Sequence, residues 1–150
     1  MPKRSNSTVR IEYAVPRKKV ETALQQYLKR ISTQIKVHRA ILFGSYAQDN
    51  YSPGSDIDIA IIADDLPSDP GKRFAMLKDT ILGLDLQPFA YTTEEWDMMV
   101  RTHSSLASEI LKHGKVIVPI EGGRKARKSY YGSVRAIGLF TAEDEMKGHD

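Results

Sequence analysis

The sequence predicts an α/β (α+β) domain in which helices pack on a small mixed β-sheet. Short apolar runs rich in β-branched residues alternate along the chain with amphipathic segments, which is typical of strands that alternate with helices. The chain has 150 residues and no cysteine. Its length suits one domain with its own core, and the lack of cysteine excludes structural disulfides and thiolate zinc sites.

The first elements expected are a helix, a strand and a sharp turn. Pro16 suits the start of a helix, because its missing N–H costs little there. Residues 37–43 favour a strand, and Gly44-Ser45 then leads into a short helical turn through Ala47. The helix is predicted from apolar residues at three- and four-residue steps: Val20, Ala23, Leu24, Tyr27, Leu28, Ile31 and Ile35.

The remaining elements continue this alternation. Residues 56–63 form the second expected strand, because the run is short and rich in β-branched residues. Residues 84–91 and 116–118 are expected as further strands. After a polar connection over residues 64–71, a second helix is predicted from Phe74, Leu77, Ile81 and Leu82 and would end at Gly83. Two later helices are expected, capped by Thr92 or Thr93 and by Ser104 or Ser105.

Charge is distributed unevenly along the chain. Residues 1–40 hold ten Lys and Arg against two Asp and Glu, whereas residues 41–121 hold six against thirteen. This pattern suits a cation-binding core whose flanks attract an anionic substrate or nucleic acid, although basic residues that merely solvate the first helix and the termini are the favoured explanation. The expected organisation is a flexible basic arm over residues 1–15, a folded domain over residues 16–120, and a basic tail over residues 121–150, either disordered or used for docking.

Membrane insertion is not expected from this sequence. No apolar run approaches the roughly 20 residues that span a bilayer. The basic, Ser-rich start also lacks the apolar region of a signal peptide. We therefore expect a cytoplasmic protein that does not contact membranes.

Two aspartates at the start of the second expected strand are candidates for chemistry. Asp56 and Asp58 flank Ile57, so both carboxylates leave the same face of the strand. Placing like charges together beside isoleucines costs several kcal/mol per buried ion unless a cation or hydrogen-bond donors offset it. Mg²⁺ is a suitable cation, because it prefers one or two carboxylates together with water and substrate phosphate oxygens.

The motif as a whole resembles the DNA-polymerase-beta-like nucleotidyltransferase superfamily, and in particular its small, minimal members. The residues that carry this resemblance are Gly44-Ser45, followed after ten residues by Asp56 and Asp58, with Ser55 directly before Asp56; each half of the motif adjoins an expected strand. The resemblance extends over about residues 20–118 and includes the order of the elements. In the family pattern an Arg and then a Gly often follow the alanine after Gly-Ser, whereas Gln48 and Asp49 follow it here.

The resemblance implies the polymerase-beta-like nucleotidyltransferase fold and an enzyme that transfers a nucleoside monophosphate from a nucleoside triphosphate, with ATP expected, to an acceptor hydroxyl. Pyrophosphate would be released. Asp56 and Asp58 would share two Mg²⁺ ions, while Gly44, Ser45 and Ser55 would bind the nucleotide. A third catalytic and metal-binding carboxylate is expected on a neighbouring strand. Asp85 is the best candidate, because the leucines beside it indicate a buried strand in which an isolated Asp needs a reason.

The resemblance also leaves alternatives open for partners. Small members of the family often work beside a helical, HEPN-type partner protein as the antitoxin of a toxin–antitoxin pair. Neutralisation of that partner would come from binding it or from adding AMP to it. A catalytically idle partner-binding module of the same fold is the alternative function. A homodimer and nucleic-acid binding through the basic ends are further alternatives, and the acceptor and base preference stay open.

Overall fold

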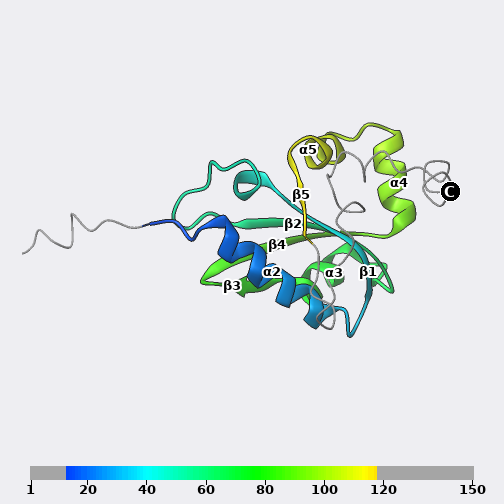
Figure 1. Cartoon of the computed structure of the whole chain (residues 1–150). Coiled ribbons are helices and arrows are strands. Elements are labelled where there is room, and N and C mark those ends of the chain that lie inside the picture. Colours follow the sequence, from blue (N-terminus) through cyan, green and yellow to red (C-terminus); the bar gives the residue numbers. More distant parts are fainter. Residues whose placement is uncertain (1–12, 118–150) are drawn as a thin grey trace, which may run out of the picture.

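A five-stranded mixed sheet organises the computed structural model, which describes residues 13–117 (Figure 1). The strand order is β3-β4-β2-β1-β5; β2 and β4 are parallel, and every other neighbouring pair is antiparallel. This architecture confirms the fold class expected from the sequence. The strands are β1 (Lys36–Phe43), β2 (Ile57–Asp64), β3 (Asp79–Ile81), β4 (Leu84–Tyr91) and β5 (Lys115–Val116).

One face of the sheet is covered by α2 (Arg17–Ile31) and α3 (Pro70–Leu77) (Figure 1). The apolar stripe of α2 produces this packing, because its residues at helical spacing all turn toward the strands. Ile35 lies beyond the end of α2 and is still buried in the same cluster. The buried members that α2 and β2 contribute to it are Val20, Leu24, Tyr27, Leu28, Ile31, Ile57, Ile59, Ile61 and Ala63.

The opposite face is covered by α4 (Thr93–Arg101) and α5 (Ser105–His113). Thr92 caps α4 in a reciprocal capping box, and the Ser104 hydroxyl accepts from the Ala107 N–H at the start of α5. Both caps are among those expected from the sequence. The buried residues of this layer are Ile41, Phe43, Ala60, Ile62, Trp96, Ala107 and Ile110, so the central strand β2 is buried on both of its faces.

The prediction that the second helix continues to Gly83 is wrong for the residues after Leu77. Helix α3 ends at Leu77, and Ile81 pairs with Leu84 across a tight hairpin instead. Leu82 and Gly83, with φ of 55° and 78°, form the two central residues of the turn. Positive φ at both positions matches the twist of a two-residue hairpin. The apolar residues at steps of three and four therefore belong to two different elements, and Gly83 serves a turn rather than a helix end.

The predicted arm and tail fall largely outside the described residues, and so does Val118, the last residue of the expected final strand. Within residues 13–117, no helix is both long enough and apolar enough to cross a bilayer. The short turn after β1 is present as the 3₁₀ helix η1 (Gly44–Tyr46). It joins the end of β1 to the loop that leads into β2.

A buried arginine connects α3, β4 and α4 near the C-terminal end of β4. Arg73 of α3 is only 8% exposed, and its guanidinium makes two hydrogen bonds to the Glu95 carboxylate, at 2.6 and 3.1 Å. It also donates to the carbonyl oxygens of Pro67, at 2.5 Å, and Ala90, at 3.1 Å. A buried guanidinium requires this many acceptors, because each unpaired donor would lose its hydration without replacement.

We expect Arg73→Met to lower the free energy of unfolding by about 2–4 kcal/mol. The substitution keeps much of the apolar volume but removes the partner of Glu95 and of two carbonyl groups. Urea denaturation of both proteins measures the loss. Arg30→Met is the matched control, since the Arg30–Asp79 ion pair is more exposed and is expected to contribute less than about 1 kcal/mol. Equal losses in the two variants would contradict the structural role of Arg73.

The Arg73–Glu95 ion pair predicts that the protein loses stability in acid. Hydrogen bonds from Arg73 lower the pKa of Glu95 in the folded protein. The stabilisation is therefore complete above the unfolded-state pKa, about 4.3, and is lost as the pH falls through the lowered folded value. Urea midpoints measured between pH 6 and 3 should fall less steeply for Arg73→Met than for the wild type. If the urea midpoints of the two proteins fell in parallel with pH, Glu95 would not contribute to the loss of stability in acid.

Candidate functional site

The two aspartates of the motif share one face of the sheet at the start of β2. Asp58 lies in β2, and Asp56 immediately precedes it. Ile57 and Ile59 point into the core on the α2 side, which leaves both carboxylates on the opposite face. Asp56 is exposed and Asp58 is half-buried. Burial raises the pKa of Asp58, and the nearby charge of Asp56 raises it further. The charges of the two carboxylates therefore repel each other.

Gly44 brings the backbone of the turn directly against Asp58. Phe43, the last residue of β1, pairs with Asp58 in the antiparallel register, so the turn begins beside that carboxylate. Gly44 has φ of 77°, and a Cβ at this position would collide with Asp58 Oδ2. Glycine is thus needed for the backbone conformation and for the close approach. Ser45 follows at the start of η1 with its side chain half-buried.

Ser55 shapes the loop that delivers Asp56. Its hydroxyl accepts a hydrogen bond from the Ser52 N–H at 2.9 Å, and its own N–H donates to the Ser52 carbonyl at 3.0 Å. These bonds close a turn of four residues immediately before Asp56. The geometry assigns Ser55 a part in positioning the first carboxylate.

Asp85 lies on the neighbouring strand and on the same face as the pair. In the parallel register Asp58 is opposite Gln87, so Asp85 stands level with Asp56. Leu84 and Leu86, on either side of Asp85, point into the core, but Asp85 itself is exposed. The expectation that Asp85 is buried is therefore wrong, because a strand buries only alternate side chains where one of its faces is open.

Gln87 is a site residue that sequence reasoning missed. It faces the same side of the sheet as Asp58 and Asp85 because paired residues of parallel strands share a face. No local pattern marks it, since glutamine is common on exposed strand faces. The signal that identifies it is the register of β4 against β2, which only the folded chain provides.

The three aspartates differ from half of the other carboxylates of the described chain. Glu21, Asp49, Asp64, Asp79 and Glu95 each lie within ion-pair distance of a basic side chain, whereas no such pair involves Asp56, Asp58 or Asp85 among residues 13–117. Within the same residues, no group of three or more His, Cys, Asp or Glu side chains is close enough to hold a metal ion. The structure thus brings Asp56 and Asp58 together and places Asp85 nearby without closing a three-carboxylate cluster.

The carboxylates of Asp56 and Asp58 are suitable ligands for magnesium. A partly desolvated carboxylate beside a second one, with no described cation to offset them, is the arrangement that a hard divalent ion stabilises. Mg²⁺ needs only one or two protein carboxylates when substrate phosphates and water complete its shell.

The loop after η1 shows how the chain accommodates its departure from the family pattern. Asp49 stands where the pattern often has glycine and adopts φ of 60°, a left-handed conformation that aspartate tolerates. Its carboxylate pairs with Arg17 of α2 at 2.9 Å. Gln48, in place of the usual arginine, donates to Glu109 of α5 at 3.0 Å. The loop is therefore held from both faces of the sheet.

Comparisons with known proteins show the family of the chain. The chain matches the family "Polymerase beta, Nucleotidyltransferase" over residues 23–121. Over 47 residues it is 40% identical to a Methanocaldococcus jannaschii protein provisionally named protein adenylyltransferase MJ0141, in a match that covers 30% of this chain and 48% of that protein. The chain thus matches about half the length of this curated relative.

Two solved structures align with most of the chain at low identity. A toxin–antitoxin crystal structure with AMP-PNP aligns with a TM-score of 0.45 and 20% identity, covering 90% of this chain and 94% of that one. A mutant of the MntA–HpeT toxin–antitoxin complex aligns with a TM-score of 0.43 and 18% identity, covering 86% and 93%. At these TM-scores neither carries a conclusion about ligands or partners. The family match contains the whole motif, from Gly44 to Asp85. On that match, the chain belongs to the polymerase beta nucleotidyltransferase family.

Proposed function

We propose that the chain is a magnesium-dependent nucleotidyltransferase that transfers a nucleoside monophosphate, with ATP as the expected donor, to a hydroxyl group on a partner protein. The observation that carries this proposal is the Asp56–Asp58 pair, which has no described cationic partner and lies against the glycine turn. Family membership supports the reaction class. The name of the M. jannaschii relative supports AMP as the transferred group and a protein as the acceptor.

The proposed roles follow from where each residue lies. Asp56 and Asp58 would hold Mg²⁺, which neutralises phosphate charge and makes a bound hydroxyl more acidic. Gly44 leaves room for the leaving phosphates to approach the backbone, and the Ser45 hydroxyl adds a donor. Ser55 keeps Asp56 in place through its turn with Ser52. Asp85 and Gln87 face the acceptor from the neighbouring strand.

The transfer is a single in-line displacement. The acceptor oxygen forms a bond to the α-phosphorus, while the bond from that phosphorus to the bridging oxygen of the β-phosphate breaks. Pyrophosphate leaves with that electron pair. The hydroxyl proton passes to the Asp85 carboxylate and from there to water. The exposure of Asp85 favours this role, because a carboxylate that is open to solvent can pass the proton on to water.

The test follows two labels in one reaction. The full chain is incubated with Mg²⁺, the protein encoded beside it, and ATP labelled at either the α- or the γ-phosphate. We expect the α label on the neighbour and the γ label in released pyrophosphate, with both signals lost in excess chelator. Transfer from none of the four common triphosphates, with the neighbour still bound, would instead support the partner-binding module. Chromatography of the same mixture tests the proposals of a helical, HEPN-type partner and of a homodimer.

A further inference from the structure

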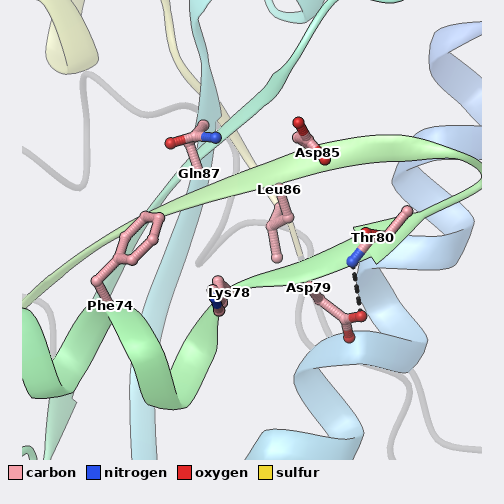
Figure 2. A pocket seen from close by; sticks show the side chains of 7 residues that line it. All are labelled: Phe74, Lys78, Asp79, Thr80, Asp85, Leu86 and Gln87. Atoms are coloured by element: carbon pink, nitrogen blue, oxygen red, sulfur yellow. Dashed lines mark hydrogen bonds between the residues drawn. The ribbon is translucent and has the colours of Figure 1, made fainter.

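A recess adjoins the carboxylate face on the side of β4. It has a volume of about 420 Å³, within the range of pockets that hold one small ligand or one side chain with its flanks. Figure 2 shows that its walls come from three successive elements: the end of α3, the edge strand β3 and the start of β4. The residues that line it are Phe74, Lys78, Asp79, Thr80, Asp85, Leu86 and Gln87.

The strand order places this pocket on one flank of the carboxylates and the glycine turn on the other. The order is β4-β2-β1, so Gly44 follows β1 on one side of Asp58, while Asp85 and Gln87 lie on β4 on the opposite side. In an in-line displacement the attacking oxygen enters opposite the leaving group. If pyrophosphate leaves over the Gly44 turn, as the proposed function requires, the acceptor approaches from the β4 side. Asp85 and Gln87 of β4 line the pocket on that side.

The charges of the pocket favour an acidic acceptor. Asp79 is neutralised by Arg30 at 2.7 Å, and its other oxygen accepts from the Thr80 N–H. Asp85 is assigned to the reaction. Lys78 is exposed and forms no ion pair within residues 13–117, so its ammonium is the one positive charge among the residues that line the pocket, beside the unpaired carboxylate of Asp85.

Phe74 provides the apolar part of the wall. It is 40% exposed, one of few large apolar side chains in the described residues that remain open to solvent, and Figure 2 shows its ring beside the pocket across from Gln87. A single aromatic ring together with a single cation suits a segment that presents an apolar group and a carboxylate near its hydroxyl. Nucleic acid is less suitable, because its backbone requires several cations along its path.

We propose that this pocket binds the acceptor segment of a protein: a hydroxyl side chain lies over Asp85, an acidic neighbour pairs with Lys78, and an apolar group packs on Phe74. This proposal rests on the proposed transferase function for its orientation. Lys78 and Phe74 are specificity-determining residues in this arrangement. They select the acceptor without contacting the nucleotide.

The test measures peptide binding separately from transfer. Two fluorescent peptides carry the same central serine and apolar residue, one flanked by glutamates and the other by lysines. Their binding to the full chain is followed by anisotropy with Mg²⁺ and an α,β-methylene analogue of ATP, which cannot transfer its nucleotide. We expect the acidic peptide to bind at least tenfold more tightly than the basic one. Lys78→Glu should abolish or reverse this preference, and Phe74→Ala should weaken both peptides.

Lys72→Glu is the matched control, because Lys72 is an exposed lysine of α3 that does not line the pocket. It changes net charge by the same amount and should leave the preference intact. No preference in the wild type, a preference that survives Lys78→Glu, or tighter binding of an oligoribonucleotide that competes with the peptide would each overturn the proposal. Parallel reactions with labelled ATP report on the transferase separately. Selective acidic binding without transfer would reject the proposed reaction and leave the docking specificity established.

Discussion

Asp58→Asn is expected to abolish nucleotide transfer and to make the metal-free protein more stable. The loss of activity should be about 10³-fold or more, because metal-assisted charge stabilisation supplies several kcal/mol to such a displacement. The gain in stability follows from the raised pKa of Asp58, which burial causes first and Asp56 second. A carboxyl whose folded pKa exceeds its unfolded value contributes most stability below the unfolded value and loses it as the pH rises. Asparagine removes this penalty at neutral pH.

Two measurements check this prediction. Transfer is assayed with α-labelled ATP and Mg²⁺, and thermal unfolding is followed in chelator at pH 7 and at pH 4. The wild type and Asp58→Asn should differ in melting temperature at pH 7, and the difference should narrow at pH 4, where the wild-type carboxyl is more protonated. Asp64→Asn is the control at the opposite end of β2, where the carboxylate pairs with His38 at 2.9 Å. It should keep transfer and gain no stability. Full activity in Asp58→Asn would show that the Asp58 carboxylate takes no part in the reaction.

Gly44→Ala is expected to damage both the fold and the reaction. The left-handed φ costs about 1–2 kcal/mol for a residue with a Cβ. The collision of this Cβ with Asp58 Oδ2 adds about 1–3 kcal/mol, since the turn or the carboxylate must move. Displacement of either one separates the backbone that we propose binds phosphate from the carboxylate pair. We therefore expect at least a 10²-fold loss of transfer, by the sensitivity of in-line geometry to small shifts.

Gly83→Ala separates backbone strain from the collision. Gly83 has nearly the same φ, 78°, but an added Cβ there meets no atom within 4 Å. The variant should therefore show the strain alone, about 1–2 kcal/mol in urea denaturation, with transfer unchanged. The difference between the two variants measures the contact with Asp58. Equal destabilisation and equal activity in both would contradict a close approach of Gly44 to the site.

Most elements could be predicted because their signals are local. The apolar stripe of α2, the β-branched run of β2 and the capping residues Thr92 and Ser104 each act within a few residues of their own position. The hairpin between β3 and β4 could not be predicted in this way. Its apolar residues fit a helical period, and only antiparallel pairing of Ile81 with Leu84 decides in favour of the hairpin.

The sequence by itself determined that a glycine turn and an alternating pair of aspartates would adjoin two strands, because strand alternation places both carboxylates on one face whatever the rest of the chain does. Tertiary structure decided what surrounds them. The parallel register of β4 against β2 sets Asp85 level with Asp56 and brings Gln87 opposite Asp58, and the Arg73–Glu95 pair joins residues 22 positions apart. The physical reason is that register and long-range ion pairs depend on how whole elements pack, which no short stretch of residues encodes.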